Sequence, residues 1–327
     1  MKISFDQYVE NVEKILLDNG LDKEQSFVIA DYMATVDFYG IKSHGVSVLD
    51  AHLKKIKKGH YNLTPKFTTE KESSSFAVIN GDNAIGMISG DYCVKYAIKR
   101  AAKSGIFTVL SHNNNTYGSA FYYVLKAAEQ GYICFTACNS PAQMAPFGGI
   151  QKMIGTNPFA VSVPALKGHP LIIDMATSVM AKSKIKEYYE RGEKIPEGVA
   201  LDRNGDKTDD PVEALNGLML PMAGFKGYGI SLMIDILSGL LSGAAFLDSV
   251  GRFYGENDNS MNVGYIFTLI SPKAVFGEDF YKKVDDYIAR IRTSEKKGIG
   301  EIILPGDDRI NIFKENLEKG LEWTISL

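Results

Sequence analysis

The segment SHG, residues 43–45, contains the histidine with the clearest chemical potential in this chain. Only 5 histidines occur among the 327 residues. An imidazole, with an unperturbed pKa of about 6.5, can give or take a proton near neutral pH. His44 also lies in a short connection between two expected helices, where a histidine can simply cap a turn. The residue types alone favour the turn and leave general acid–base catalysis open.

A glycine-rich segment, GFKGYG at residues 224–229, is a second candidate because it precedes an apolar stretch. Backbone amides at a helix N-terminus can hold a phosphate, and Lys226 would add a positive charge there. A tight turn into a buried helix explains the glycines equally well. The G-x-G-x-x-G pattern of the common dinucleotide-binding fold is absent from the sequence. The segment alone is therefore weak support for a phosphate site.

Asp174 follows the apolar run PLII, which places it at the carboxyl end of an expected buried strand. An aspartate there is either a helix N-cap or a carboxylate of a ligand site, because such strand ends often line crevices. The segments APFGG, residues 145–149, and GTNP, residues 155–158, are typical of turns.

The other histidines and the cysteines do not suggest a metal centre. His52 and His60 lack the companions that a zinc site needs, so we expect surface residues and no metal. Cys134 and Cys138 lie in a run typical of a buried strand, where cysteine acts as a small apolar residue, and Cys93 makes their number odd. This usage fits a reducing cytoplasm.

Composition excludes several classes of partner. The net charge of -3 and the pI of about 6.0 give no basic surplus for nucleic acid. The lysines of HLKKIKKGH, residues 52–60, are expected to form a solvated helix face. The N-terminus has no apolar signal core, and no run of about 18 apolar residues predicts a membrane span. We expect a soluble, cytoplasmic protein.

The chain reads as α/β. Ser4 is expected to cap a first helix ending at Gly20, and Asp22 a second reaching Gly40. A third helix covers residues 46–58. Short runs rich in β-branched residues predict strands at 76–80, 106–111, 132–138, 158–164, 170–174 and 263–270, with helices at 87–103 and 118–129. Residues 227–246 predict a buried helix, 278–292 another helix, and 301–323 a strand, a turn and a helix.

Several motifs in one order resemble the malate/L-lactate dehydrogenase family, which also includes ureidoglycolate, sulfolactate and diketogulonate reductases. They run along nearly the whole chain: GIKSHGV, NNNTYGSAFYYVLKAAEQGYI, APFGGIQKMIGTNPFAVSVPA, IIDMATS, DRNGDKTDDP, PMAGFKGYGISLMIDILSGLLSGA and LPGDD. The resemblance implies a non-Rossmann, sulfolactate dehydrogenase-like three-layer fold with a mixed sheet of about seven strands and terminal helices. It also implies a homodimer. Residues 1–72 with 275–327 would form the substrate and dimer domain, and 73–274 the cofactor domain.

The resemblance further implies a nicotinamide-dependent oxidoreductase of small 2-hydroxy or 2-oxo acids. His44 would be the acid–base residue, with Ser43 beside it, and Thr116 would stand at a further catalytic position. NAD is favoured slightly by the charge balance, with NADP possible. The residues implied to contact the cofactor are Ser140, Asp174, Met175, Ala176, Lys184, Lys226, Gly227, Pro305, Gly306 and Asp307.

Three positions depart from the family pattern. Tyr39 and Val48 stand where arginines are common, and Thr116 replaces a histidine that some members are thought to use as a base. A nearby histidine, His112, is not expected to substitute for it. Because a hydroxyl or a methyl cannot reproduce a guanidinium's paired hydrogen bonds, two explanations remain. The chain acts on a different substrate, which we favour, or it keeps the fold as a non-catalytic binding protein.

Overall fold

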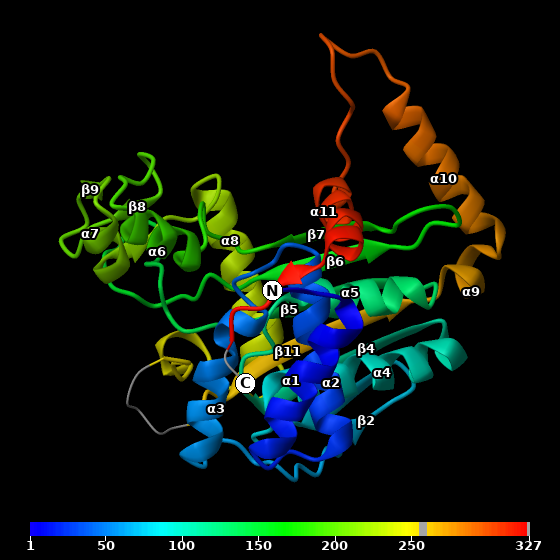
Figure 1. The fold of residues 1–327 in the computed structure, drawn as a ribbon, viewed down its shortest axis with the longest axis horizontal. Coiled ribbons are helices and arrows are strands. Elements are labelled where there is room, and N and C mark those ends of the chain that lie inside the picture. Colours follow the sequence, from blue (N-terminus) through cyan, green and yellow to red (C-terminus); the bar gives the residue numbers. More distant parts are fainter. Residues whose placement is uncertain (255–259, 326–327) are drawn as a thin grey trace.

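A seven-stranded mixed sheet forms the centre of the computed structural model, which describes residues 1–254 and 260–325 (Figure 1). The strand order is β2-β3-β4-β11-β5-β6-β7, with β3 and β4 parallel and every other neighbouring pair antiparallel. The strands are β2 (Thr68–Glu72), β3 (Phe76–Asn80), β4 (Ile106–Asn114), β5 (Ile133–Cys138), β6 (Phe159–Val163), β7 (Leu171–Met175) and β11 (Val263–Ile270). The predicted α/β fold with about seven strands is confirmed.

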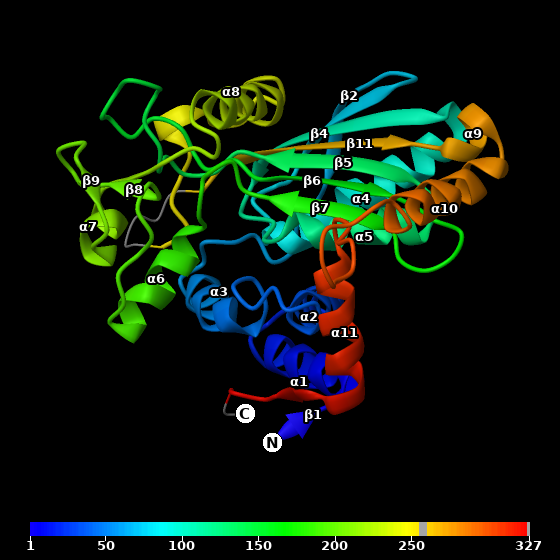
Figure 2. The same cartoon turned by 90° about the horizontal axis from the view of Figure 1, so that it is seen from above.

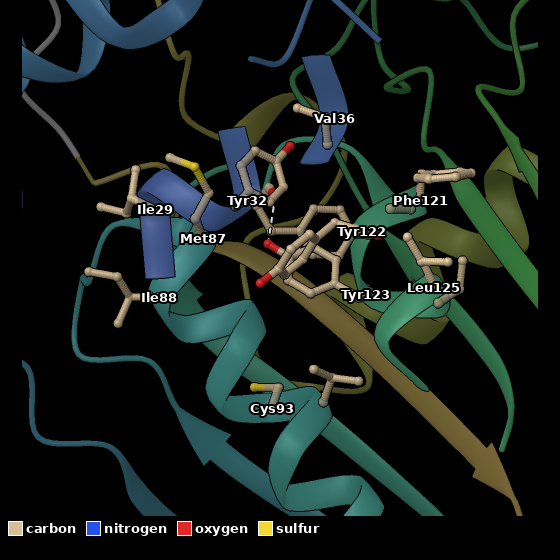
Figure 3. Close-up of a cluster of buried hydrophobic side chains, with 14 of the residues drawn as sticks. Ile29, Tyr32, Val36, Met87, Ile88, Cys93, Phe121, Tyr122, Tyr123 and Leu125 are labelled. Atoms are coloured by element: carbon tan, nitrogen blue, oxygen red, sulfur yellow. Dashed lines mark hydrogen bonds between the residues drawn. The ribbon is translucent and has the colours of Figure 1, made fainter. Parts of the chain in front are cut away.

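Helices cover both faces of this sheet (Figure 2). On one face lie α4 (Gly86–Ser104) and α5 (Ala120–Glu129), and on the other lie α8 (Phe225–Ile234) and the π-helix η2 (Asp235–Leu240). Short apolar strands pack between them because their side chains point alternately to the two helical layers. The main core gathers between the sheet, α4, α5 and the N-terminal helices, where Tyr32 lies beside Tyr122 and Tyr123 (Figure 3).

The two chain termini pack together on the outer side of α4 and α5 (Figure 2). The capping box that Ser4 forms with Gln7 starts α1 as predicted, and Asp22 caps α2. Asn316 donates to the carbonyl of Phe38 at 2.8 Å, which ties α11 to α2. The elements here are β1 (Lys2–Ile3), α1 (Phe5–Asp18), α2 (Lys23–Phe38), the 3-10 turn η1 (Val46–Val48), α3 (Leu49–Lys57), α11 (Asp307–Lys319) and β12 (Leu321–Glu322).

A small lobe projects from one end of the sheet and has its own apolar core (Figure 2). It consists of α6 (Lys182–Arg191), β8 (Ala200–Leu201), β9 (Lys207–Thr208), α7 (Pro211–Asn216) and β10 (Leu218–Met219). At the opposite end lie α9 (Pro272–Phe276) and α10 (Asp279–Arg292), and the 3-10 turn η3 (Leu247–Ser249) precedes β11.

Three expectations are wrong, two about secondary-structure elements and one about the exposure of a histidine. Residues 301–304 do not form a strand, because they run as an extended connection between α10 and α11. The predicted buried helix at 227–246 is interrupted by η2 and buries only one side, so its other side is apolar and exposed. His52 is not a surface residue: it is 4% exposed, and its Nδ1 lies 3.0 Å from the hydroxyl of Tyr61.

The strand β2 was not foreseen, because its residues TTEKE carry no apolar alternation. It nevertheless pairs with β3 along the edge of the central sheet, so the sheet begins before residue 73. The division into a substrate and dimer domain and a cofactor domain stays a prediction.

The buried cysteines behave as expected. Cys93, Cys134 and Cys138 are all free and buried, and burial raises the pKa of each thiol. They are therefore protonated, apolar packing residues at neutral pH.

Candidate functional site

The loop that carries His44 is held by a buried carboxylate at the end of α2. Asp37 is 6% exposed, and its Oδ2 accepts hydrogen bonds from the hydroxyl of Tyr8 and from the amide of Val46, the latter at 3.0 Å. The same amide lies 3.1 Å from the Tyr8 hydroxyl. The second oxygen of Asp37, Oδ1, is buried without a partner. This network connects α1, α2 and the start of η1, so it orients the loop between them.

Gly45 is required by this packing. A Cβ at that position would lie 1.9 Å from Oδ1 of Asp37, which no side chain can tolerate. Burial raises the pKa of Asp37 to about 6, although its hydrogen bonds from Tyr8 and Val46 oppose the shift. The glycine of SHG thus has a steric reason that is independent of catalysis.

His44 itself is half-buried, and its ring is oriented by its neighbour. Ser43 Oγ lies 2.8 Å from His44 Nδ1. Among the residues that the structure describes, Nε2 has no hydrogen-bond partner. The atoms packed around the ring lower the pKa of His44 to about 4, so the free imidazole is neutral at pH 7.

The hydroxyl of Ser43 influences which nitrogen of the neutral ring carries the proton. If Nδ1–H donates to the hydroxyl oxygen, Nε2 carries a lone pair and acts as a base. The imidazolium that forms then holds the transferred proton on Nε2 and acts as the acid in the reverse direction. The pair Ser43–His44 can therefore form a reversible acid–base unit.

Asp174 lies at the carboxyl end of β7 and caps a helix of another segment. Its Oδ2 accepts from Ser119 Oγ at 2.8 Å and from the amide of Phe121 at 3.1 Å, at the N-terminus of α5. The Ser119 amide in turn donates to the hydroxyl of Tyr32. Asp174 therefore caps a helix, and this does not conflict with a role at a ligand site, because a capping carboxylate at a strand end can also contact a ligand.

Thr116 lies three residues before this cap, in the turn between β4 and α5. Its Oγ1 is 3.4 Å from the amide of Gly118, and the residue is half-buried. His112, four residues earlier in the sequence, contacts Glu70 of β2, with Nε2 of His112 2.9 Å from the carboxylate. The expectation that His112 does not replace a base at Thr116 agrees with this contact.

Tyr39 does not occupy a ligand-facing position. It is 3% exposed, stacks on Phe313 of α11 with ring centroids 4.2 Å apart, and its hydroxyl lies 2.9 Å from Nε2 of His169. Val48 is half-buried within η1. Tyr39 is therefore a packing residue that fastens α11 to the end of α2.

A guanidinium that the motifs did not indicate arrives from α11 instead. Arg309 donates to the carbonyl of Gly40 at 3.0 Å, four residues before His44, and its positive charge also acts on Asp174. Arg309 lies 269 positions from Gly40 in the chain. The one sequence signal for Arg309 is its place directly after the LPGDD motif. That motif does not indicate the direction in which the Arg309 side chain points.

Ser140 is fixed at the end of β5 by an asparagine hub. Asn157 Oδ1 accepts from the amide of Ser140 at 3.0 Å, and Asn157 Nδ2 donates to the carbonyl of Ser231 in α8 at 2.9 Å. Ser231 Oγ in turn donates to the carbonyl of Gly155, in the same segment as Asn157, at 2.9 Å. The GTNP segment, expected only to turn, in fact joins β5, β6 and α8.

The end of β7 leads directly to the glycine-rich segment. Met175 and Ala176 follow Asp174, and Thr177 accepts at its carbonyl from the amide of Met222 at 2.8 Å. A Cβ on Gly227 would lie 2.1 Å from the carbonyl oxygen of Met222, so this position needs glycine.

Lys226 lies in the first turn of α8, is exposed, and has no ion pair in the described part of the chain. A positive helix N-terminus with an uncommitted lysine suits a phosphate group.

The remaining predicted cofactor residues have protein partners. Lys184 pairs with Glu187 at 2.7 Å on the surface of α6. In the PGD turn, Pro305 accepts at its carbonyl from Ile172 of β7, and Asp307 accepts from Arg292 at 2.6 Å and from the amide of Leu304 at 2.8 Å. Gly306 adopts a φ of +97°, which favours glycine.

A concave region of about 900 Å³ lies beside this turn, and His44 is not among its lining residues.

Residues 1–254 and 260–325 provide neither a metal-binding group nor a membrane-spanning helix. They contain no group of three or more His, Cys, Asp or Glu side chains placed to hold a metal ion. None of their helices combines the length and the apolarity that crossing a membrane requires.

The fold and the site define a class before any single relative is considered. The chain combines a seven-stranded mixed sheet, a histidine in an SHG loop and a helix that begins at a glycine-rich segment. The malate/L-lactate dehydrogenase family model matches residues 3–326. The chain belongs to this family, and the predicted enzyme class is confirmed.

Individual relatives agree over most of their length. The chain is 37% identical to malate dehydrogenase of Pyrococcus horikoshii over 305 residues, which is 90% of this chain and 84% of the relative. It is 32% identical to ureidoglycolate dehydrogenase (NAD(+)) of Escherichia coli, over 98% of this chain and 92% of the relative. The solved structure of sulfolactate dehydrogenase from Methanocaldococcus jannaschii superposes with a TM-score of 0.91 at 34% identity, covering 99% of this chain and 93% of that one.

Proposed function

We propose that this enzyme transfers a hydride between a nicotinamide cofactor and carbon 2 of a small 2-hydroxy or 2-oxo acid, with His44 as the acid–base residue. The observation that carries the proposal is the held, neutral imidazole: Asp37 fixes its loop, Ser43 engages Nδ1, and Nε2 is left for a ligand. The names of relatives as malate, sulfolactate and ureidoglycolate dehydrogenases support the substrate class.

A bound nicotinamide would accept the hydride from the carbon that bears the hydroxyl, or return it to a carbonyl carbon. In the oxidative direction, Nε2 of His44 takes the hydroxyl proton as the C–H electron pair leaves. In the reductive direction, Nε2 donates a proton to the oxygen that gains charge. Ser43 Oγ accepts from Nδ1–H in both directions, because the imidazolium that forms in the oxidative direction is the acid of the reductive one.

The cofactor is held, in this proposal, by Ser140, by Asp174 to Ala176 and by the N-terminus of α8 with Lys226. Lys226 is better suited to this role than Lys184, because Lys184 is already paired with Glu187. The PGD turn, residues 305–307, contributes through its backbone, since the carboxylate of Asp307 is taken up by Arg292 and Leu304. The small negative net charge favours NAD slightly over NADP.

We also infer a homodimer. The exposed side of α8 and η2 is apolar, as is the segment directly after it, and such a face is unfavourable in water. Its members are Ile230, Met233, Ile236, Leu237, Leu240 and Leu241. Their spacing of three and four residues places them on one stripe, which suits a second helix of the same kind.

The variant His44→Ala tests the assigned role. We expect kcat to fall by about 10²–10⁴-fold, the usual contribution of a positioned acid–base group, while the dissociation constant for NADH stays within about threefold. The measurement is a spectrophotometric screen of hydroxy acids and oxo acids with NADH and NADPH, followed by kinetics on the best substrate.

His112→Ala is the matched control, because this histidine binds Glu70 of β2 and lies outside the site. The control should keep wild-type kcat. Full activity of His44→Ala would falsify the role of His44, and silence of the wild-type protein with every substrate would overturn the proposed reaction.

A further inference from the structure

Arg309, the third residue of α11, places a guanidinium at the base of the loop that carries His44. Its Nη1 donates to the carbonyl of Gly40 at 3.0 Å and lies 3.5 Å from the carbonyl of Tyr39. The loop then turns back at once, because the amide of His44 donates to the carbonyl of Ile41 at 3.1 Å. The guanidinium is therefore attached to the same short segment as the proposed acid–base residue.

Contacts also join Arg309 to the end of β7. The ring of Tyr39 lies 4.8 Å from the ring of Phe121, and the amide of Phe121 donates to Asp174 Oδ2 at 3.1 Å. The turn that precedes α11 accepts a hydrogen bond at 3.3 Å from the amide of Ile172, two residues before Asp174. Burial raises the pKa of Asp174, whereas hydrogen bonds and the positive charge of Arg309 lower it. Arg309 is thus linked to both sides of the candidate site.

One edge of this guanidinium is free to bind a ligand. A guanidinium has five N–H donors, and Nη1 serves the carbonyls at the end of α2. Nε lies 3.7 Å from the carboxylate of Asp308, which is too far for a strong hydrogen bond. Across residues 1–254 and 260–325, Nη2 has no hydrogen-bond partner. Because 38% of the Arg309 side chain is exposed, a ligand can reach the edge formed by Nε and Nη2.

The proposed reaction needs a cation close to His44. A 2-hydroxy acid carries its carboxylate on the carbon next to the one that gives up the hydride, so the groups that bind the two must lie close together. Tyr39 and Val48 carry no charge. Lys42 lies in the same loop, but it is exposed and offers only a point charge. A guanidinium instead binds a carboxylate through two parallel hydrogen bonds.

We propose that Arg309 binds the carboxylate of the substrate through its Nε and Nη2 edge, while Nη1 holds the loop of His44. This inference rests on the proposed function and goes beyond it by naming the residue that recognises the acid. One side chain then sets the distance between the bound carboxylate and the imidazole, because it contacts both the ligand and the base of the loop. Arg309 is thus a specificity-determining residue.

The variant Arg309→Lys separates this role from a purely structural one, in which Arg309 only caps the end of α2. A lysine keeps the charge and a donor for the Gly40 carbonyl, but it lacks the planar fork. We expect KM for 2-hydroxy acids to rise by about tenfold with kcat within about threefold. The matching neutral 2-hydroxy amide should keep its kcat/KM within about threefold. An unchanged KM for the acids in this folded variant overturns the proposal.

The variant Arg309→Gln removes the charge as well and allows a test without turnover. Oxamate, a carboxylate that resembles a small 2-oxo acid, serves as the probe in calorimetry on the full chain with NADH present. We expect its affinity to fall by about 10²-fold in Arg309→Gln. This loss in a protein that turns over no hydroxy acid would support the inference and reject the proposed reaction. Turnover with an unchanged preference for acids over amides in Arg309→Gln would keep the reaction and reject the inference.

Lys319→Gln is the matched control, because it removes a positive charge from the same helix at its far end. There Lys319 pairs with Glu315 at 2.7 Å. The control should keep the wild-type KM and oxamate affinity. An equal change in the control, or no oxamate binding by the wild type, overturns the proposal.

Discussion

At the scale of single residues, the proposed chemistry depends on how firmly the loop that carries His44 is held. The Asp37 carboxylate fills the space beside Gly45 and receives the amide of Val46, so the loop cannot shift without disturbing α2. The same enclosure that orients the ring also lowers the pKa of His44 to about 4 and raises the pKa of Asp37 to about 6. Position and protonation therefore have one physical cause.

These two pKa values predict an unusual pH profile. A base must be neutral to act. As the pH is lowered, kcat/KM for alcohol oxidation should therefore not fall at pH 6.5, the ordinary pKa of histidine, but only at lower pH, with a midpoint near pH 4. Around pH 6 the Asp37 carboxyl changes charge, and any inflection there should disappear in Asp37→Asn. The rate profile is measured with circular dichroism at each pH to exclude unfolding. A single midpoint near 6.5 in both proteins would contradict the enclosure of His44.

At the scale of elements, Asn157 joins three of the pieces that surround the proposed cofactor site. Its amide side chain connects Ser140 after β5 with Ser231 in α8, and its own backbone leads into β6. If the side chain were removed, the Ser140 amide would lose its acceptor, and the Ser231 carbonyl would keep only the amide of Asp235 as a donor. The hub keeps the strand ends and the helix start in one geometry.

We predict that Asn157→Ala lowers the free energy of unfolding by roughly 2–4 kcal/mol, because buried polar groups are left unpaired. NADH affinity should fall by about tenfold as Ser140 and α8 lose their common anchor. Urea unfolding and fluorescence titration measure the two effects. Asn204→Ala, in the exposed turn between β8 and β9, is the control and should change neither quantity. Unchanged NADH affinity in the folded Asn157→Ala protein would remove the hub from the cofactor site.

At the scale of the whole molecule, the proposed homodimer depends on the apolar stripe on α8 and η2. Leu240 is 54% exposed and Leu241 58%, although both belong to a segment of almost entirely apolar sequence. The sheet covers one side of this segment, and a second copy would cover the other. The two α8 N-termini, and with them Lys226, would then lie near the interface.

Leu241→Glu should convert the dimer to a monomer, because a carboxylate buried between two copies has no partner. Sedimentation velocity at micromolar concentration measures the change, and circular dichroism should stay the same. Leu317→Glu is the control: this leucine of α11 is 49% exposed and lies away from the stripe. A wild-type monomer would overturn the proposed dimer, and a dimer that survives Leu241→Glu would place the interface elsewhere.

Much of the fold was predictable because it follows from local patterns. The caps at Ser4 and Asp22 and the β-branched runs each depend on neighbours within a few residues. The strand β2 and the false strand at 301–304 show the limit, since pairing along a sheet edge needs a partner from elsewhere in the chain.

The sequence by itself determined the family, the candidate acid–base residue and the glycine turns, because each is a matter of residue type at a short spacing. Only the tertiary structure decided that Tyr39 is a packing residue and that Arg309 comes to Gly40 from α11. The physical reason is the same in each case. A charge or a ring acquires its role from the partner it meets, and these partners lie on segments that the folding of the whole chain brings together.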